Sequence, residues 1–221
     1  EMCIRDRKYL TQKKVTGSQF GGENMATVEE NKTEKRSKLM EAAHSLFTSG
    51  SALKPPTIDE VVKMAGVAKG TFYLYFKDKY DLMDQLFLKK LAECVNSALF
   101  KTRQQLAGRQ VEDAERVNAF LDNVFMYINE NKAFLPLIRD RVSSCYRLML
   151  KGREAELKEA YDSLVKLFLR HGFTEYESEM NIYMLVSMLA PVSCDSTIQG
   201  EPYKLDEIKS GMQRLTNKLL A

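Results

Sequence analysis

Apolar residues recur at spacings of three and four from residue 33 almost to the end of this 221-residue chain. This spacing places side chains on one face of an α-helix. The first stripe contains Leu39, Met40, Ala43, Leu46 and Phe47, and a longer one contains Leu82, Met83, Leu86, Phe87, Leu91, Val95, Ala98 and Leu99. No alternating strand pattern and no internal repeat accompany them. The sequence therefore predicts an all-α protein with about nine helices.

The expected helices are short before residue 80 and long after it, and this change divides the chain. We expect a small module in residues 30–78 and a long-helix bundle in residues 79–221. Within the bundle, breaks at Gly152, Gly172 and the turn at 199–202 separate the later helices. These are predicted over residues 111–131, 134–150, 153–171, 176–190 and 204–220.

Residues 1–24 are polar and show no sustained period, and Met25 has the character of a start residue. We expect residues 1–24 to form a disordered or non-native extension outside the fold. The alternative is a basic arm that follows a DNA groove. Its cationic side chains would be Arg5, Arg7, Lys8, Lys13 and Lys14.

Bulk composition narrows the class of protein only slightly. The formal net charge is +3, so any attraction to nucleic acid must come from a local patch. No apolar run approaches the roughly 18 residues needed to span a bilayer, and no secretory signal is visible. Cys3, Cys94, Cys145 and Cys194 lack metal-ligand spacing and are interpreted as reduced thiols. We expect a cytoplasmic protein with no membrane partner.

Residues 57–76 contain the pattern of two short helices joined by a tight turn. Thr57 and Glu60 form a capping box, and the preceding pair of prolines prevents an earlier helix start. Gly66 suits the turn because it tolerates positive φ, and a second helix opens at about Ala68. This layout predicts a helix-turn-helix whose second helix enters the DNA major groove.

The second of these helices divides its side chains between two faces. Phe72 and Phe76 lie four apart and are expected in the core. The opposite face carries Gly70 and Leu74, flanked by Thr71 and Tyr73, and Tyr75 lies on a flank. Lys69 before these residues, and Lys77 and Lys79 after them, are placed to contact phosphates. Spacing alone leaves a second interpretation open, in which the lysines form an ordinary solvated face and the tyrosines cover the core.

The stretch "TIDEVVKMAGVAKGTFYLYFKDKYDLMDQL" resembles the signature of TetR-family (tetracycline-repressor-like) transcriptional regulators, with similarity over residues 36–88. The remaining two-thirds resembles the family only in being a long-helix bundle. Two positions depart from the pattern: Ala68 replaces a common Ser, and Leu74 occupies a position that is commonly His. The resemblance implies DNA contacts by Thr57, Ala68, Lys69, Gly70, Thr71, Tyr73, Leu74, Tyr75 and Lys79.

The last two predicted helices are candidates for a subunit interface. Residues 205–219 carry a narrow seam with alternating spacings of three and four, and residues 180–190 are apolar nearly all round. Both helices could instead lie wholly inside one subunit. The resemblance favours a homodimer whose interface contains Met180, Tyr183, Met184, Ser187, Met188, Leu205, Ile208, Met212, Leu215 and Leu219.

The middle helices are expected, by the same resemblance, to surround a pocket for a small-molecule effector. Eleven methionines favour an adaptable apolar pocket, and hence a hydrophobic or amphipathic ligand. Plain core packing is the alternative for each residue. The candidates are Phe87, Phe120, Phe125, Tyr127, Phe134, Tyr146, Met149 and Phe168.

The resemblance thus implies a ligand-responsive DNA-binding transcriptional regulator, by default a repressor that binds a pseudo-palindromic operator as a dimer. The alternative is a helical protein-interaction module that has lost DNA binding, which the departures at Ala68 and Leu74 leave open. An enzyme is not expected, because no phosphate loop, HExxH or GxSxG motif is present. His44 and His171 have no Cys or His partner at ligand spacing, so neither a metal nor a cofactor is predicted.

Overall fold

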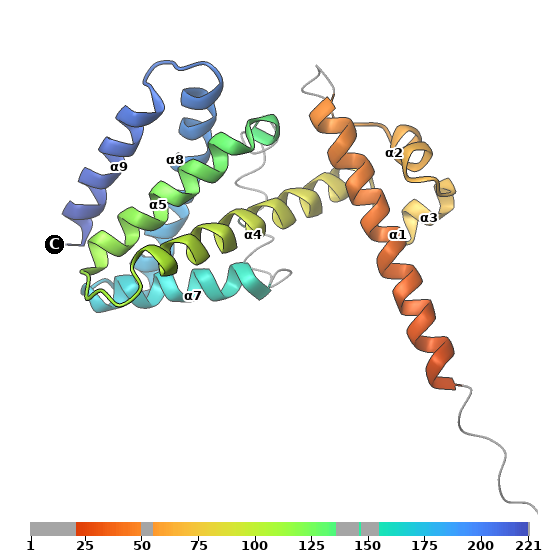
Figure 1. Ribbon diagram of the computed structural model, residues 1–221, viewed down its shortest axis with the longest axis horizontal. Coiled ribbons are helices and arrows are strands. Elements are labelled where there is room, and N and C mark those ends of the chain that lie inside the picture. The colour runs from red at the N-terminus through yellow and green to blue at the C-terminus, as the bar shows by residue number, and fades with distance from the viewer. Residues whose placement is uncertain (1–20, 50–54, 136–145, 147–154, 221) are drawn as a thin grey trace, which may run out of the picture.

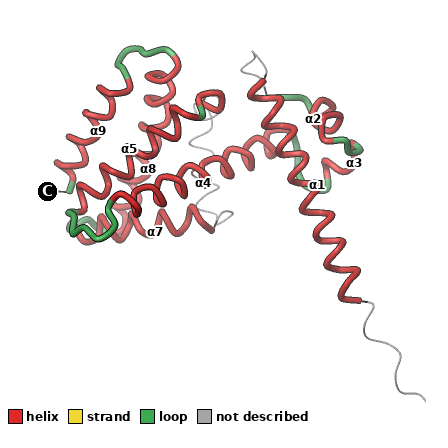
Figure 2. The backbone as a smooth tube through the Cα atoms, in the orientation of Figure 1, coloured by secondary structure: helices red, strands yellow, loops and turns green. Residues whose placement is uncertain are grey.

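The computed structural model describes residues 21–49, 55–135, 146 and 155–220. In these ranges the regular elements are eight α-helices and one 3-10 helix, without a strand (Figure 2). The prediction of an all-α protein is therefore confirmed. Figure 1 shows a small group of three helices at one end of the molecule and a bundle at the other, with α4 (Lys79–Gln105) running from one to the other.

The first helix, α1 (Gly21–Ser49), begins earlier than expected. Gly21 to Asn24, which we expected to belong to a disordered or non-native extension, are part of this helix. Once a helix is nucleated, each added residue gains a backbone hydrogen bond, and no proline interrupts this segment. Figure 1 shows the first part of α1 extending beyond the other helices. Residues 1–20, with the proposed basic arm, lie outside the described residues.

Two short helices, α2 (Ile58–Ala65) and α3 (Lys69–Tyr73), complete the N-terminal group and pack on α1. The predicted capping box is present, since the amide of Glu60 donates to Thr57 Oγ1 at 3.3 Å and the Thr57 amide donates to Glu60 Oε2 at 2.7 Å. Gly66 ends α2 at φ 67°, in the left-handed region. Phe72 and Phe76 are buried in the core with residues of all three helices, as predicted.

The long helix α4 is joined to the N-terminal group by side-chain contacts. Asp78 caps its start by accepting hydrogen bonds from two backbone amides, at 2.8 and 2.9 Å. Arg36 of α1 donates to Gln85 Oε1 at 2.7 Å, and its guanidinium lies 5.9 Å from the centre of the Phe76 ring. A movement of α4 therefore acts directly on α1 and on the core of the small module.

The bundle contains α5 (Asp113–Glu130), the 3-10 helix η1 (Lys132–Phe134), α7 (Ala155–Arg170), α8 (Glu175–Ile198) and α9 (Leu205–Leu219). The predicted helix over 134–150 falls almost entirely outside the described residues. The helix predicted to end at residue 190 continues through Pro191 to Ile198. A proline removes one helical hydrogen bond, and packing offsets this loss because Ser193 and Cys194 beyond it are buried.

Polar contacts fix the helices of the bundle to one another. Buried Asn123 of α5 donates through Nδ2 to Thr102 Oγ1 and Gln105 Oε1 of α4, both at 3.0 Å. At the other end of α5, Asp113 lies 3.0 Å from Arg170 and 3.2 Å from His171. Burial acts to raise the pKa of Asp113, but hydrogen bonds from these two residues outweigh it, and the net pKa lies below its ordinary value.

Candidate functional site

The exposed side of α3 is the surface on which the predicted DNA contacts gather. Figure 1 shows α2 and α3 on the side of α1 that faces away from the bundle. Leu74, the residue that follows α3, has 77% of its surface exposed, and Tyr73 has 55%. Gly70 is exposed, and a Cβ atom built on it meets no atom within 4 Å. Another molecule can therefore approach this backbone closely.

The start of α3 carries both a missing cap and a charged pair. The side chain of Ala68 makes no capping hydrogen bond, as expected for alanine at this position. Lys69 Nζ lies 2.8 Å from Asp59 Oδ1 of α2, and the hydrogen bond from this contact raises the pKa of Lys69. Both side chains are solvent-exposed. A DNA phosphate can therefore replace Asp59 as the partner of a lysine that stays protonated.

The other residues predicted to contact DNA already make contacts within the protein, to different degrees. The Thr57 hydroxyl donates to Glu60 Oε2 at 2.7 Å as part of the capping box. Thr71 and Tyr75 are half-buried, and the Tyr75 ring packs near Phe76 at a centroid distance of 6.4 Å. These residues border the exposed patch rather than project from it.

The start of α4 is less open to an anion than its helix dipole suggests. Asp78 already occupies the amides of Tyr80 and Asp81. Lys79 Nζ lies 5.1 Å from the centre of the Tyr80 ring, so its ammonium group is close to an aromatic face. Lys77 is exposed. Contacts to phosphate at this end depend on the two lysine side chains.

A cavity of about 200 Å³ lies among α4, α5, α7 and α8. Four of the residues expected at a pocket line it, namely Phe87, Phe120, Tyr127 and Tyr146. The structure places two others elsewhere: Phe125 packs with Leu121 and Met212 in a separate cluster, and Phe168 packs edge-on against Phe173. The Phe134 side chain and Met149 lie outside what the structure describes.

Other wall residues were not expected from the sequence. Leu91 and Val95 follow Phe87 at helical spacing, so their phase on α4 could have identified them. Lys90 and Tyr161 also line the cavity, and a charged or polar side chain usually indicates a solvated face. The Tyr161 hydroxyl is buried and has no hydrogen-bond partner among the described residues. Only the packing of distant helices identifies these polar groups as wall residues.

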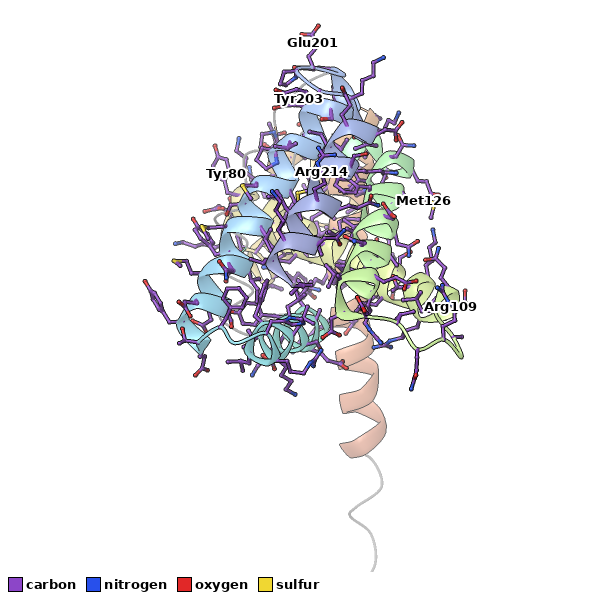
Figure 3. All side chains as sticks on the ribbon, turned by 90° about the vertical axis from the view of Figure 1, so that its left-hand side faces the viewer. Tyr80, Arg109, Met126, Glu201, Tyr203 and Arg214 are labelled. Atoms are coloured by element: carbon purple, nitrogen blue, oxygen red, sulfur yellow. The ribbon has the colours of Figure 1, made fainter. Side chains whose placement is uncertain are left out.

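An exposed apolar face covers parts of α8 and α9, which lie toward the viewer in Figure 3. We call it the α8–α9 face. Five residues of the predicted interface lie on it with 41–52% of their surface exposed: Met180, Tyr183, Met184, Met188 and Leu215. Tyr203, labelled near the turn between the two helices in Figure 3, and Tyr176 are also exposed, although the sequence did not single them out.

The other five predicted interface residues make contacts within the subunit. Leu205, Ile208 and Met212 pack around Phe125 and Leu121 of α5, so α9 uses this side of its seam within the subunit. Leu219 packs against the main core. The Ser187 hydroxyl is buried without a hydrogen-bond partner in the described part of the chain. Ile208 and Met212 also line a groove with Met188 and Leu215, so the assignment of these residues to a dimer interface stays a prediction.

A helix-turn-helix with an exposed second helix, joined to a helical bundle, is the architecture of a DNA-binding transcriptional regulator. Comparison with known proteins agrees. Residues 39–86 match the family described as "Bacterial regulatory proteins, tetR family". The HTH-type transcriptional regulator YdgC of Bacillus subtilis, itself uncharacterized, is 30% identical over 160 residues, which cover 71% of this chain and 77% of YdgC. The chain belongs to the TetR family.

Two further comparisons concern regulators of lipid metabolism. The fatty acid metabolism regulator protein of B. subtilis is 27% identical over 113 residues, 51% of each chain. The fatty acid degradation regulator FadR of Bacillus halodurans has the same fold, with a TM-score of 0.56 and 19% identity over 85% of this chain and 95% of that one. The chain spans only 34–51% of the length of several curated relatives.

None of the helices in the described ranges is long and apolar enough to cross a membrane. No group of three or more His, Cys, Asp or Glu residues in those ranges is arranged to hold a metal ion.

Proposed function

We propose that this DNA-binding regulator is a dimeric repressor, released from a pseudo-palindromic operator by a hydrophobic or amphipathic small molecule bound in the cavity. The observation that carries the proposal is the position of α4. Phe87, Leu91 and Val95 of this helix line the cavity, and its first turns contact α1 through the Arg36–Gln85 hydrogen bond. A ligand that prefers one position of α4 therefore biases the placement of α3 on DNA.

The chemistry of the cavity wall supports an apolar effector. Most of the side chains that line it are aliphatic or aromatic, and an apolar ligand gains by leaving water for such a site. The names of the B. subtilis fatty acid metabolism regulator and of FadR from B. halodurans support a ligand of fatty-acid-like chemistry.

The α8–α9 face supports dimerisation. An exposed cluster of methionine, tyrosine and leucine side chains is unfavourable in water, and such apolar patches mark protein interfaces. A two-fold axis through this face relates two copies of α3, as two half-sites of a palindrome require.

DNA binding and release are tested together. Sequences that bind the full chain are selected from a random DNA pool, and their affinity is measured by fluorescence anisotropy at two salt concentrations. Contacts with phosphate predict a steep loss of affinity at the higher salt concentration. Absence of binding to any DNA would support the alternative of a protein-interaction module. Binding that no lipophilic compound weakens would reject the effector.

Dimerisation is tested by Leu215→Glu. Leu215 is 52% exposed, so a charge there is tolerated in the folded subunit and opposes burial against a second copy. Sedimentation equilibrium is expected to show a monomer. The matched control is Leu169→Glu on α7, where the leucine is 45% exposed and lies outside the α8–α9 face. Equal dissociation by both variants, or by neither, contradicts the assignment.

A further inference from the structure

We propose that Lys90 anchors an anionic head group, so that the effector is a carboxylate-bearing amphiphile whose apolar chain fills the cavity. This inference rests on the effector role of the cavity proposed above, and it specifies the chemistry of the ligand and the end at which it is held.

Lys90 is the one charged side chain among the described residues that line the cavity. Its position on α4 is one helical turn from both Phe87 and Cys94, which are wall residues too. Burial raises the pKa of the Cys94 thiol to about 12, so the thiol stays neutral beside the lysine. The other described residues of the lining carry no charge.

The present partner of Lys90 lies outside the cavity wall. Lys90 Nζ is 2.7 Å from Glu93 Oε2, and Glu93 is not among the lining residues. An ammonium group has three N–H donors, and Glu93 is the one hydrogen-bond partner of Lys90 found in the described residues. A ligand carboxylate can use the remaining donors without first breaking the contact with Glu93.

Tyr127 adds a neutral donor beside this lysine. Its hydroxyl lies 3.5 Å from Glu93 Oε2, and its ring lines the cavity. Burial, and then the charge of Glu93, raise the pKa of Tyr127 to about 12, so the phenol keeps its proton. A hydrogen bond 3.5 Å long is weak, and rotation of this hydroxyl toward a ligand carboxylate loses little. Together the ammonium and phenol groups suit an oxyanion better than an alcohol.

Lys89, next along α4, is exposed and is not among the residues that line the cavity. It carries the same charge as Lys90 on the same helix, so it offers a matched control for a charge outside the cavity wall.

The test compares three probes that share an alkyl chain and differ in their head group: decanoate, decanol and decylammonium. Their affinities for the full chain are measured by isothermal titration calorimetry, with wild type, Lys90→Gln, Lys90→Arg and the control Lys89→Gln. Decanoate is expected to bind about tenfold more tightly than decanol, the factor that corresponds to 1.4 kcal/mol. Lys90→Gln should remove this preference and leave decanol binding unchanged, whereas Lys90→Arg and Lys89→Gln should retain it.

Three results overturn the anchor: equal affinity for decanoate and decanol, tighter binding of decylammonium, or an equal effect of Lys89→Gln. The fluorescence anisotropy of labelled DNA, measured with the same three probes, separates the Lys90 anchor from the effector role of the cavity. Selective decanoate binding that leaves DNA bound supports the Lys90 anchor and overturns the proposed release. Binding of none of the three probes overturns both.

Discussion

Leu74→Ala tests whether the exposed residue after α3 reads DNA. Complete burial of a leucine side chain stabilises by about 1.5–3 kcal/mol. Leu74 is already 77% exposed in the free protein, so its truncation should lower the free energy of unfolding by only about 0.5 kcal/mol. If a thymine methyl group covers half of this side chain, truncation weakens operator binding by about 1 kcal/mol, or roughly fivefold.

Replacement of thymine by deoxyuridine in the selected operator removes only the methyl group that Leu74 is expected to touch. We expect one thymine position whose replacement weakens wild-type binding and has no further effect on Leu74→Ala. Such a double-mutant cycle isolates the contact between the two groups. Leu169→Ala on α7, also an exposed leucine, is the control and should leave affinity unchanged.

Three results refute this reasoning. Equal weakening of operator and random-sequence DNA by Leu74→Ala would mean that Leu74 does not face the bases. Additive effects of the protein and DNA changes at every thymine would show that no methyl group lies against it. A large loss of unfolding free energy, measured by urea denaturation, would contradict the exposed position of the side chain.

Three further substitutions have distinct expected results. Asp59→Asn removes the partner of Lys69; the free energy of unfolding should change little because the pair is exposed to solvent, while anisotropy should show tighter binding to all DNA and a steeper dependence on salt. Unchanged affinity would place Lys69 away from phosphate. Thr57→Ala should lower the free energy of unfolding by about 1 kcal/mol in urea, and Thr57→Ser should restore it, because the capping box stabilises α2. Asp113→Asn should destabilise the protein at neutral pH. The folded-state pKa of Asp113 is lowered, so its contribution is present above the ordinary carboxyl pKa and is lost as pH falls through the folded value. The difference from wild type in thermal unfolding should therefore shrink in acid, and a constant difference would contradict the assignment.

Local sequence was sufficient for the helix-turn-helix. The capping box of Thr57 and Glu60 and the turn at Gly66 depend on residues three to six positions apart, and the structure contains both. The four-residue spacing of Phe72 and Phe76 likewise identified the buried side of this segment. Each feature rests on short-range geometry, which a single chain segment specifies by itself.

Helix ends were less predictable where packing opposes local preference. The helix predicted over 176–190 continues through Pro191 to Ile198, because Ser193 and Cys194 beyond the proline are buried against the bundle. The start of α1 at Gly21 is a second case, since propagation from a formed helix overrides a weak local pattern.

Short-range patterns in the sequence were enough to predict the all-α class, the helix-turn-helix and the apolar stripe of each helix. Which neighbour each stripe meets depends on the tertiary structure. Met212 and Leu215 belong to one seam of α9, yet Met212 packs against α5 and Leu215 remains exposed. Lys90 is a charged residue, a type that usually lies on the surface, yet it lines the cavity. Periodicity reports the faces of one helix, whereas the use of a face depends on helices distant in the chain.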